Sequence, residues 1–306
     1  CGIISLFNRS AYVGYTATPF ANIFIPQNEN DLFPRDFIIN IPAPTNYIGP
    51  EKVFGTSIVP DDDGNGLLPI IIPIKDTNFF IPIGHKKDDV KPSFYDIPQS
   101  LKTAVKCFIV TCAIRIARGQ ETKHNSMLIH VSRFQAWQNH IRELVERLFI
   151  YYKNEIEAND YSTLEEFREI LEVDNEDYKS FKTITSEIST SKYSDVDNCL
   201  TFHSWSEIRP LLFKAVQKIE VKSINGTSGD NLTYYENYKS GISVIAIGGD
   251  KLSRGLTLEG LSISYFLRAS KMYDTLMQMG RWFGYRPKYV DLCRLFTSEE
   301  LNEWYR

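Results

Sequence analysis

The sequence predicts an α/β fold in which helices flank a parallel β-sheet. Short apolar runs at residues 127–131, 242–247 and 261–267 have the length and composition of buried strands. Runs of this kind are typical of strands that are covered on both faces, as in parallel sheets. Helical stretches alternate with them in the second half of the chain. Strands separated by helices imply parallel pairing.

The first part of the chain divides at a change in composition. Residues 11–25 (AYVGYTATPFANIFI) predict a buried strand that leads into a threonine-rich turn. Residues 26–98 carry prolines at short intervals between isoleucine-rich runs. Because proline is excluded from central strands and from helix interiors, this region is predicted to be a loop-rich insertion with edge-type strands.

The remainder, residues 99–306, predicts the main α/β body with a helical insertion at about 141–200. Apolar residues at helical spacing predict a helix over 99–118, which Gly119 ends. Thr297 with Glu300 three residues on is the signature of a capped final helix. The other predicted elements are a strand at 127–131, a helix at 136–153, a charged and partly helical stretch at 161–194, strands at 218–224, 242–247 and 261–267, a helix before residue 286 and a strand at 289–296.

Composition excludes several classes of protein. The net charge is −4, from 34 basic and 38 acidic residues, so any nucleic-acid contact must come from a local groove. The 5 cysteines include no Cys-x-x-Cys pair and the 5 histidines are dispersed, so we predict no metal site and reduced thiols in a cytoplasmic protein. No apolar run approaches the roughly 20 residues that span a bilayer. The chain starts at Cys1, without methionine or a clear signal peptide, so we expect it to be a piece of a longer protein.

Two arginines are candidates for catalysis. Arg281 and Arg286 lie in the run GRWFGYR, where a guanidinium held by a rigid element can stabilise the charge on a nucleotide γ-phosphate. Gly280 allows the close approach of a phosphate or of a facing lobe. The alternative is a pair of surface salt bridges of little energetic value.

A glycine-rich loop follows the predicted strand at 242–247. In an open α/β sheet, ligands lie beyond the carboxyl ends of the strands, and glycine lets backbone N–H groups face a phosphate there. A tight turn without a ligand is the alternative. The residues of this loop that we assign to cofactor or nucleic-acid binding are Gly249, Lys251, Ser253, Arg254, Gly255 and Thr257.

Two further predicted strand ends carry polar residues. Thr16 and Thr18 follow the predicted strand of the amino-terminal segment, and Ser132 and Arg133 follow the strand at 127–131. We assign these four residues to nucleic-acid contacts. A local Ser/Thr turn is the alternative for the threonines, and a helix cap is the alternative for Ser132.

Two other patterns favour ordinary structure over chemistry. Glu220 and Lys222 resemble the carboxylate–lysine pair of metal-dependent endonucleases, but alternating charges on a strand usually mark one solvated face. Residues 61–66 (DDDGNG) lack the spaced ligands of a calcium loop and predict a solvated turn.

The chain has no phosphate-binding loop of the type GxxxxGK[ST] and no Asp-Glu dipeptide for a magnesium-coordinating motif. The residues that would hold the β- and γ-phosphates and the metal are therefore missing from it. ATP and Mg²⁺ are expected cofactors of the longer protein, and neither is expected to bind this chain alone.

Segments across the chain resemble the Z-one domain family of endonuclease-type proteins, which occur joined to superfamily-two helicase modules in bacteria. The segments that carry the resemblance are GYTATPFANI, DLFPRDFII, HNSMLIHVSRFQAW, IGGDKLSRGLTLEGLS and LMQMGRWFGYRPKYVDLCRLF.

The resemblance implies that residues 99–306 form the second RecA-like lobe of a helicase-like protein and that residues 1–25 are the tail of the first. Residues 15–19 then match helicase motif III, SRGLTLEGL matches motif V and GRWFGYR matches motif VI. Two departures stand out: Thr257 replaces an acidic residue, and Gly284 stands where a second arginine is expected.

The resemblance further implies the carboxyl-side part of a DNA-directed ATPase of a bacterial restriction or phage-defence system. Its partners would be nucleic acid, the upstream lobe and other proteins of a defence complex, with no membrane. The alternatives are a degenerate RecA-like scaffold without ATPase activity and a metal-dependent endonuclease.

Overall fold

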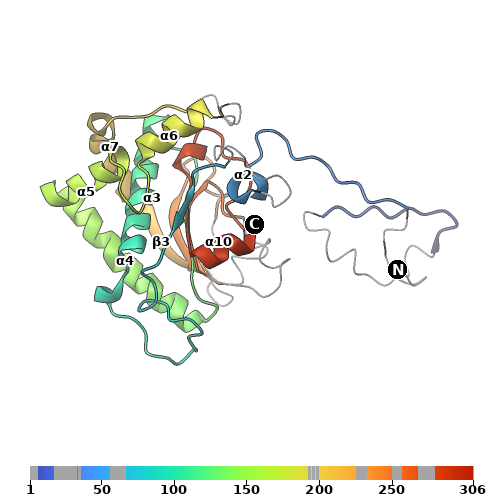
Figure 1. Ribbon diagram of the computed structural model, residues 1–306, viewed down its shortest axis with the longest axis horizontal. Helices are drawn as coiled ribbons and strands as arrows, with labels where there is room; N and C mark the ends of the chain where they lie inside the picture. Colours follow the sequence, from blue (N-terminus) through green and yellow to red (C-terminus); the bar gives the residue numbers. More distant parts are fainter. Residues whose placement is uncertain are drawn as a thin grey trace.

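A six-stranded parallel sheet with helices on both sides forms the centre of the molecule, as the sequence predicts (Figure 1). The computed structural model describes residues 6–16, 33, 36–55, 67–191, 194, 197, 200–224, 233–249, 257–267 and 280–305. The strand order is β1-β6-β5-β2-β4-β3, and every described pairing is parallel. This arrangement is consistent with a RecA-like sheet. The strands are β1 (Ile71–Pro73), β2 (Asn125–His130), β3 (Ile219–Ile224), β4 (Ser243–Gly248), β5 (Leu261–Phe266) and β6 (Arg294–Thr297).

The three central strands are buried along their whole length. Every residue of β2, β4 and β5 is buried, which explains why these segments read as continuous apolar or small-residue runs. In register, Met127 of β2 lies between Ile245 of β4 and Ile263 of β5. The predictions of strands at these three places are confirmed.

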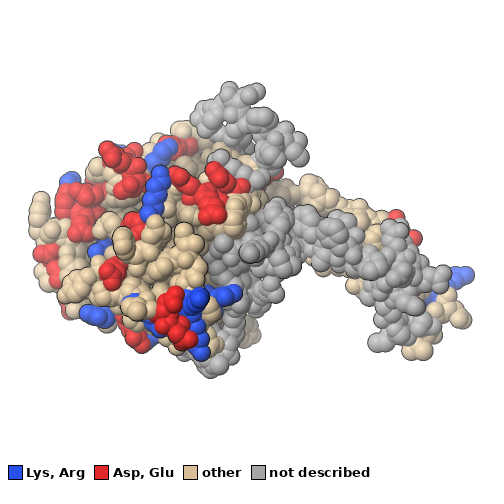
Figure 2. All heavy atoms as spheres, turned by 60° about the horizontal axis from the view of Figure 1, so that its bottom comes forward, with Lys and Arg blue, Asp and Glu red and all other residues tan. Residues whose placement is uncertain are grey.

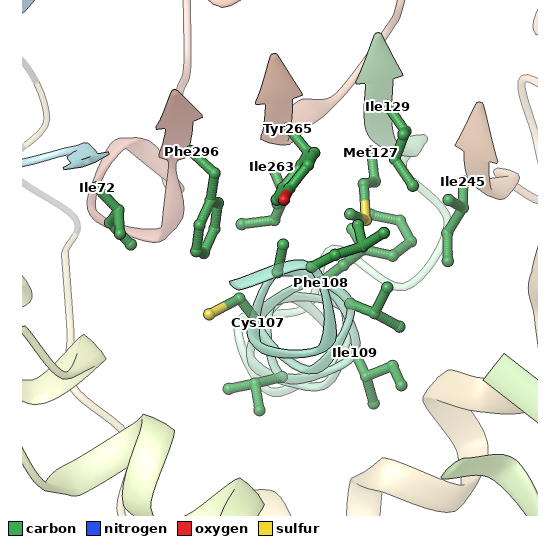
Figure 3. Close-up of a cluster of buried hydrophobic side chains, with 14 of the residues drawn as sticks. Ile72, Cys107, Phe108, Ile109, Met127, Ile129, Ile245, Ile263, Tyr265 and Phe296 are labelled. Atoms are coloured by element: carbon green, nitrogen blue, oxygen red, sulfur yellow. The ribbon is translucent and has the colours of Figure 1, made fainter. Parts of the chain in front are cut away.

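Helix α3 (Gln99–Ala117) packs on one face of the sheet and is the most deeply buried helix of the described chain. Figure 3 shows Phe108 and Ile109 beneath side chains of β2, β4 and β5. The helix starts after Pro98, and the carboxylate of Asp76 accepts a hydrogen bond from the N–H of Ser100 at 2.9 Å. Asp76 thereby satisfies one donor of the first turn, which no N-cap side chain does. The predicted helix over 99–118 is confirmed.

Of the other helices in the described residues, four lie on the same side of the sheet as α3 and two short ones lie on the other side (Figure 1). Their apolar faces join the main core, including those of the predicted helical insertion, where Phe167 and Phe181 are buried. The helices are α4 (Gln135–Glu157), α5 (Tyr161–Glu172), α6 (Phe181–Thr190) and α7 (Trp205–Gln217) on the α3 side, and α2 (Pro50–Phe54) and α10 (Glu299–Tyr305) on the other, with 3₁₀ turns η2 (Phe94–Asp96) and η4 (Val290–Leu292).

The proline-rich region contributes to the same core. Strand β1 pairs with β6 at one edge of the sheet, where Pro73 removes no central hydrogen bond, so the predicted edge strand is confirmed. Ile48, Phe54 and Phe80 are buried in the main cluster.

The amino-terminal prediction of a buried strand is wrong for the residues that the structure describes. Residues 11–16 have no regular secondary structure and are exposed, with Tyr15 at 90%. Figure 1 shows this end of the chain apart from the sheet. An apolar segment becomes a buried strand only where neighbouring strands pair with it, and no described strand does so here.

Two details near the carboxyl end also differ from the predictions. The predicted strand at 289–296 begins with η4, so β6 occupies only Arg294–Thr297. Within η4, the Asp291 carboxylate is bound by Arg118. The final helix begins at Glu299, and the hydroxyl of Ser298, not of Thr297, accepts the Leu301 N–H at 3.3 Å. Thr297 is the last residue of β6 and cannot cap a helix that starts two positions later.

The predicted helix before residue 286 lies mostly outside the described residues. Of the helices within the described ranges, none combines the length and the apolar character that crossing a bilayer requires.

Candidate functional site

The carboxyl ends of β5, β2 and β4 lie side by side. This row of strand ends is here called the carboxyl edge of the sheet. The chain leaves β2 towards β3, an edge strand, and leaves β5 in the opposite direction, towards β6, which lies next to the other edge strand, β1. A reversal of this kind opens a crevice at the carboxyl ends of the two strands, where α/β proteins bind ligands. Ser132 follows β2 and Gly249 follows β4, so the structure brings these two predicted residues to the same edge.

Ser132 is at the centre of a hydrogen-bond network. Its side chain is buried, and its Oγ atom lies 2.8 Å from the Nε2 atom of His85. The Oγ atom also accepts the N–H of Phe134 at 3.2 Å, which makes a local turn just before α4 and not a helix cap, because Phe134 is itself the N-cap residue. The Nδ1 atom of His85 lies 3.1 Å from the carbonyl oxygen of Pro82. Because a carbonyl only accepts, Nδ1 donates to Pro82, and the tautomer with its proton on Nδ1 leaves Nε2 to accept the Ser132 hydroxyl proton.

Gly249 lies close to a side-chain amide. A Cβ atom built on this residue would lie 2.3 Å from the Nε2 atom of Gln138, which donates to the Ser132 carbonyl at 3.0 Å. Gln138 is buried, and its Oε1 atom has no hydrogen-bond partner among the residues that the structure describes. A side chain at position 249 would displace this buried amide from its hydrogen bond to Ser132.

Arg133 lies at the start of α4 and is exposed. Its guanidinium carbon is 4.8 Å from the ring centroid of Phe134. Helix α4 has no side-chain cap at Phe134 and no acidic residue in its first turn. A 23-residue helix with an open amino terminus favours a negatively charged ligand, and Arg133 adds a positive charge there.

The turn that carries Arg281 and Arg286 is anchored by aromatic rings. Trp282 is buried and its ring lies 5.1 Å from Phe266, the last residue of β5, and 5.4 Å from Tyr305 of α10. Phe266 in turn lies 5.3 Å from His130, the last residue of β2. These ring contacts connect the arginine turn with the strand ends that precede Ser132.

The proline-rich region fixes the other side of this turn. Ile48 and Gly284 form an antiparallel bridge with N···O distances of 3.0 and 2.9 Å. Gly284 has a φ of 131°, which side chains other than that of glycine rarely adopt. The departure from the helicase pattern at this position therefore has a local backbone reason.

The guanidinium of Arg286 folds back on its own turn. Its Nη2 atom donates to the carbonyl oxygens of Arg281, Trp282 and Phe283 at 3.1 to 3.3 Å. Arg281 is about half buried, and desolvation lowers the pKa of its guanidinium. Arg286 thus shapes the turn that contains Arg281, and the catalytic roles of both stay predictions.

The remaining predicted residues lie elsewhere. Thr257 is exposed and precedes Glu259, whose carbonyl accepts the Ser126 hydroxyl at the amino-terminal end of β2. Thr16 is exposed in the amino-terminal segment. Thr18, Lys251, Ser253, Arg254, Gly255 and the turn at 61–66 lie outside the described residues.

The carboxylate–lysine pair forms a local contact. The Nζ atom of Lys222 lies 2.7 Å from the Oε2 atom of Glu220 on β3, which is an edge strand. Within the described part of the chain, no group of three histidine, cysteine or acidic side chains is placed to hold a metal ion.

Sequence reasoning missed the contribution of the proline-rich region to this site. His85 and Ser132 are in contact although they are 47 positions apart in the chain, and Ile48 and Gly284 are still further apart in the chain. The periodicity of apolar residues contains no signal for such contacts. A local sign was the basic run His85-Lys86-Lys87 in the proline-rich stretch.

The family model of the Z1 domain matches residues 100–306, which is more than half of the chain and includes five of the six described strands. No curated protein and no solved structure is significantly similar to it. The match starts within α3 and covers Ser132, Arg133, Gly249, Arg281 and Arg286, whereas His85 and Ile48 precede it. This chain belongs to the Z1 domain family.

Proposed function

We propose that the chain is the carboxyl-side portion of a helicase-like, nucleic-acid-dependent ATPase of a bacterial restriction or phage-defence system. In this proposal an upstream lobe holds ATP and Mg²⁺, and this chain supplies cations that face the nucleotide and the nucleic acid. ATP hydrolysis would change the contacts of the two lobes with the nucleic acid.

One observation carries the proposal. Buried Ser132, the close approach at Gly249 and the open amino terminus of α4 lie together at the carboxyl edge of a parallel sheet. Exposed Arg133 lies beside them. This combination suits a phosphate group, because backbone N–H groups and a guanidinium both stabilise negative charge. The contacts from Trp282 through Phe266 to His130 support a second point of contact at Arg281.

The two arginines have separate tasks in the proposed reaction. Arg281 would stabilise the charge that develops on the transferred phosphoryl group. Arg286 would act indirectly, because its hydrogen bonds to three carbonyl oxygens hold the turn in shape.

The test is the nucleic-acid-stimulated ATPase rate of the longer protein that contains this chain and a phosphate-binding loop. We expect Arg281→Ala to lower kcat by about 10³-fold, the effect typical of an arginine finger. Arg281→Lys should recover little, since a lysine cannot reproduce the planar guanidinium. Arg168→Ala is the matched control, because Arg168 pairs with Glu165 on α5. A rate for Arg281→Ala within a factor of two of the unmodified protein would contradict the proposal.

A scaffold within a defence complex is a second candidate. The net charge of −4 favours it, and so does the mixture of acidic and basic side chains over the face in Figure 2. A broad surface for nucleic acid would be predominantly basic. A scaffold would bind other proteins and show no salt-dependent affinity for nucleic acid, whereas the ATPase proposal requires that affinity.

A further inference from the structure

The loop of residues 82–91, here called the lysine loop, is held against the start of α4. Besides the contact between His85 and Ser132, the indole Nε1 of Trp137 donates to the carbonyl oxygen of Lys86 at 2.9 Å. The ring of His85 lies 4.5 Å from that of Trp137. Just beyond the loop, the Nε2 atom of His140 lies 2.7 Å from the carbonyl oxygen of Pro92. These contacts hold the loop beside the carboxyl ends of β2 and β4.

The lysine loop brings unpaired positive charge to that edge. Lys86 and Lys87 are exposed, Lys91 is half-buried, and none of their ammonium groups has an ion pair or hydrogen bond in the described part of the chain. Lys91 approaches only the ring of Trp137, with its Nζ atom 6.0 Å from the centroid. Asp88 and Asp89 lie in the same loop, and the Asp89 carboxylate accepts the backbone N–H of Lys86 at 2.7 Å. With Arg133, the local balance is two positive charges in excess.

Aromatic side chains flank the lysine loop on both sides in the chain. Phe79 is 90% exposed before it and Tyr95 is 93% exposed after it. A basic segment with exposed rings next to it in the chain is a combination that suits single-stranded nucleic acids, where lysines follow the phosphates and bases stack on the rings.

We propose that the lysine loop, Arg133 and the rings of Phe79 and Tyr95 form a binding surface for single-stranded nucleic acid. The inference rests on the proposed function and extends it, because it names the form of the nucleic acid and assigns its recognition to the proline-rich region. His85 is a positioning residue in this surface: through Ser132 it holds the lysines at the sheet edge.

The test measures binding of the full chain to a fluorescein-labelled 20-nucleotide polythymidine by fluorescence anisotropy, between 50 and 200 mM NaCl. The triple variant Lys86→Ala, Lys87→Ala, Lys91→Ala should weaken binding by tenfold or more at low salt. It should also reduce the slope of log K against log salt by about 2, at about 0.7 for each phosphate that the lysines no longer neutralise.

The matched control removes the same charge from the other side of the sheet, where the amino-terminal ends of the strands lie. Lys123, Lys218 and Lys239 precede β2, β3 and β4, so the triple variant Lys123→Ala, Lys218→Ala, Lys239→Ala should bind like the unmodified chain. All six lysines are at least partly exposed, so both variants are expected to fold. Equal binding by the two triple variants would overturn the inference.

The rings are tested separately. Tyr95→Ala and Phe79→Ala should each weaken polythymidine binding by about fivefold or more without changing the salt slope, because stacking involves no counterion release. Tyr235→Ala is the control, since Tyr235 is 92% exposed and lies on the approach to β4. If the two ring variants weaken binding to a 20-base-pair duplex as much, the assignment to single strands is wrong.

The outcomes separate this inference from the function on which it rests. Salt-dependent binding by the unmodified chain that neither the lysine variant nor the ring variants weaken would leave the proposed function standing and refute the surface. No salt-dependent binding by the unmodified chain would refute both.

Discussion

The Nε2 atom of His85 lies 2.8 Å from the Oγ atom of Ser132, and this contact joins the proline-rich region to the carboxyl end of β2. His85 precedes the matched Z1 domain region and Ser132 lies inside it. The contact therefore makes the proline-rich region part of the candidate site.

A double-mutant cycle measures this contact. His85→Ala and Ser132→Ala should each lower the free energy of unfolding by about 1 kcal/mol, and the double variant should show a coupling of about 1 kcal/mol, because the two single variants remove the same hydrogen bond. Chemical denaturation of the four proteins gives the values. Pairing His85→Ala with Ser189→Ala, on α6, should give additive effects, and additivity in the first pair as well would mean that the contact contributes nothing.

Gly260 and Gly119 provide a matched pair for backbone packing. Both have positive φ, at 68° and 70°, but a Cβ atom on Gly260 would lie 1.8 Å from the carbonyl oxygen of His124, whereas one on Gly119 meets nothing within 4 Å. Gly119→Ala should cost about 1–2 kcal/mol from the backbone conformation alone. Gly260→Ala should cost several times more, because the start of β2 must move. Thermal melting of the two variants compares them, and similar melting temperatures would refute the packing argument.

The buried pair of Arg118 and Asp291 should be important for stability. The carboxylate of Asp291 accepts two hydrogen bonds from Arg118, at 2.8 and 2.7 Å, and one from Thr185 at 2.6 Å. Asp291→Asn leaves the buried guanidinium without a counter-charge, so we expect a loss of about 3–5 kcal/mol in urea denaturation. Glu299→Gln, which removes the exposed pair with Lys75, should change little. Equal effects of the two substitutions would show that burial of the pair is unimportant.

Three buried thiols predict a loss of stability at alkaline pH. Burial raises the pKa of Cys112 to about 12, and those of Cys107 and Cys293 to about 11, from an ordinary value of 9.0. Above pH 9 the unfolded chain releases these protons and the folded chain keeps them, so the free energy of unfolding falls as the pH rises towards 11. Each thiol contributes a slope of about 1.4 kcal/mol per pH unit.

Denaturation of the reduced protein between pH 8 and pH 11 measures this slope. Cys112→Ala should reduce the slope by the contribution of one thiol, about 1.4 kcal/mol per pH unit. The cavity that the substitution leaves should lower the free energy of unfolding by a similar amount at every pH. An unchanged slope in that variant would mean that the Cys112 thiolate is tolerated in the folded protein.

The sequence by itself determined the class of the fold and most of its elements. Helix α3 and strands β2, β4 and β5 follow from spacing within one segment, because a helix face or a buried strand is built from residues that are near neighbours in the chain. Spacing also placed Ser132 and Gly249 at strand ends, since parallel strands present their carboxyl ends at one edge. It could not decide between Thr297 and Ser298 as the cap of α10, because that choice depends on where β6 ends.

Only the tertiary structure decided which distant segments complete the site. The contacts of His85 with Ser132 and of Ile48 with Gly284 depend on packing between parts of the chain that no local period relates. The same reason explains the wrong prediction at residues 11–16. An apolar run can be buried as a strand, but this happens only where a neighbouring strand pairs with it.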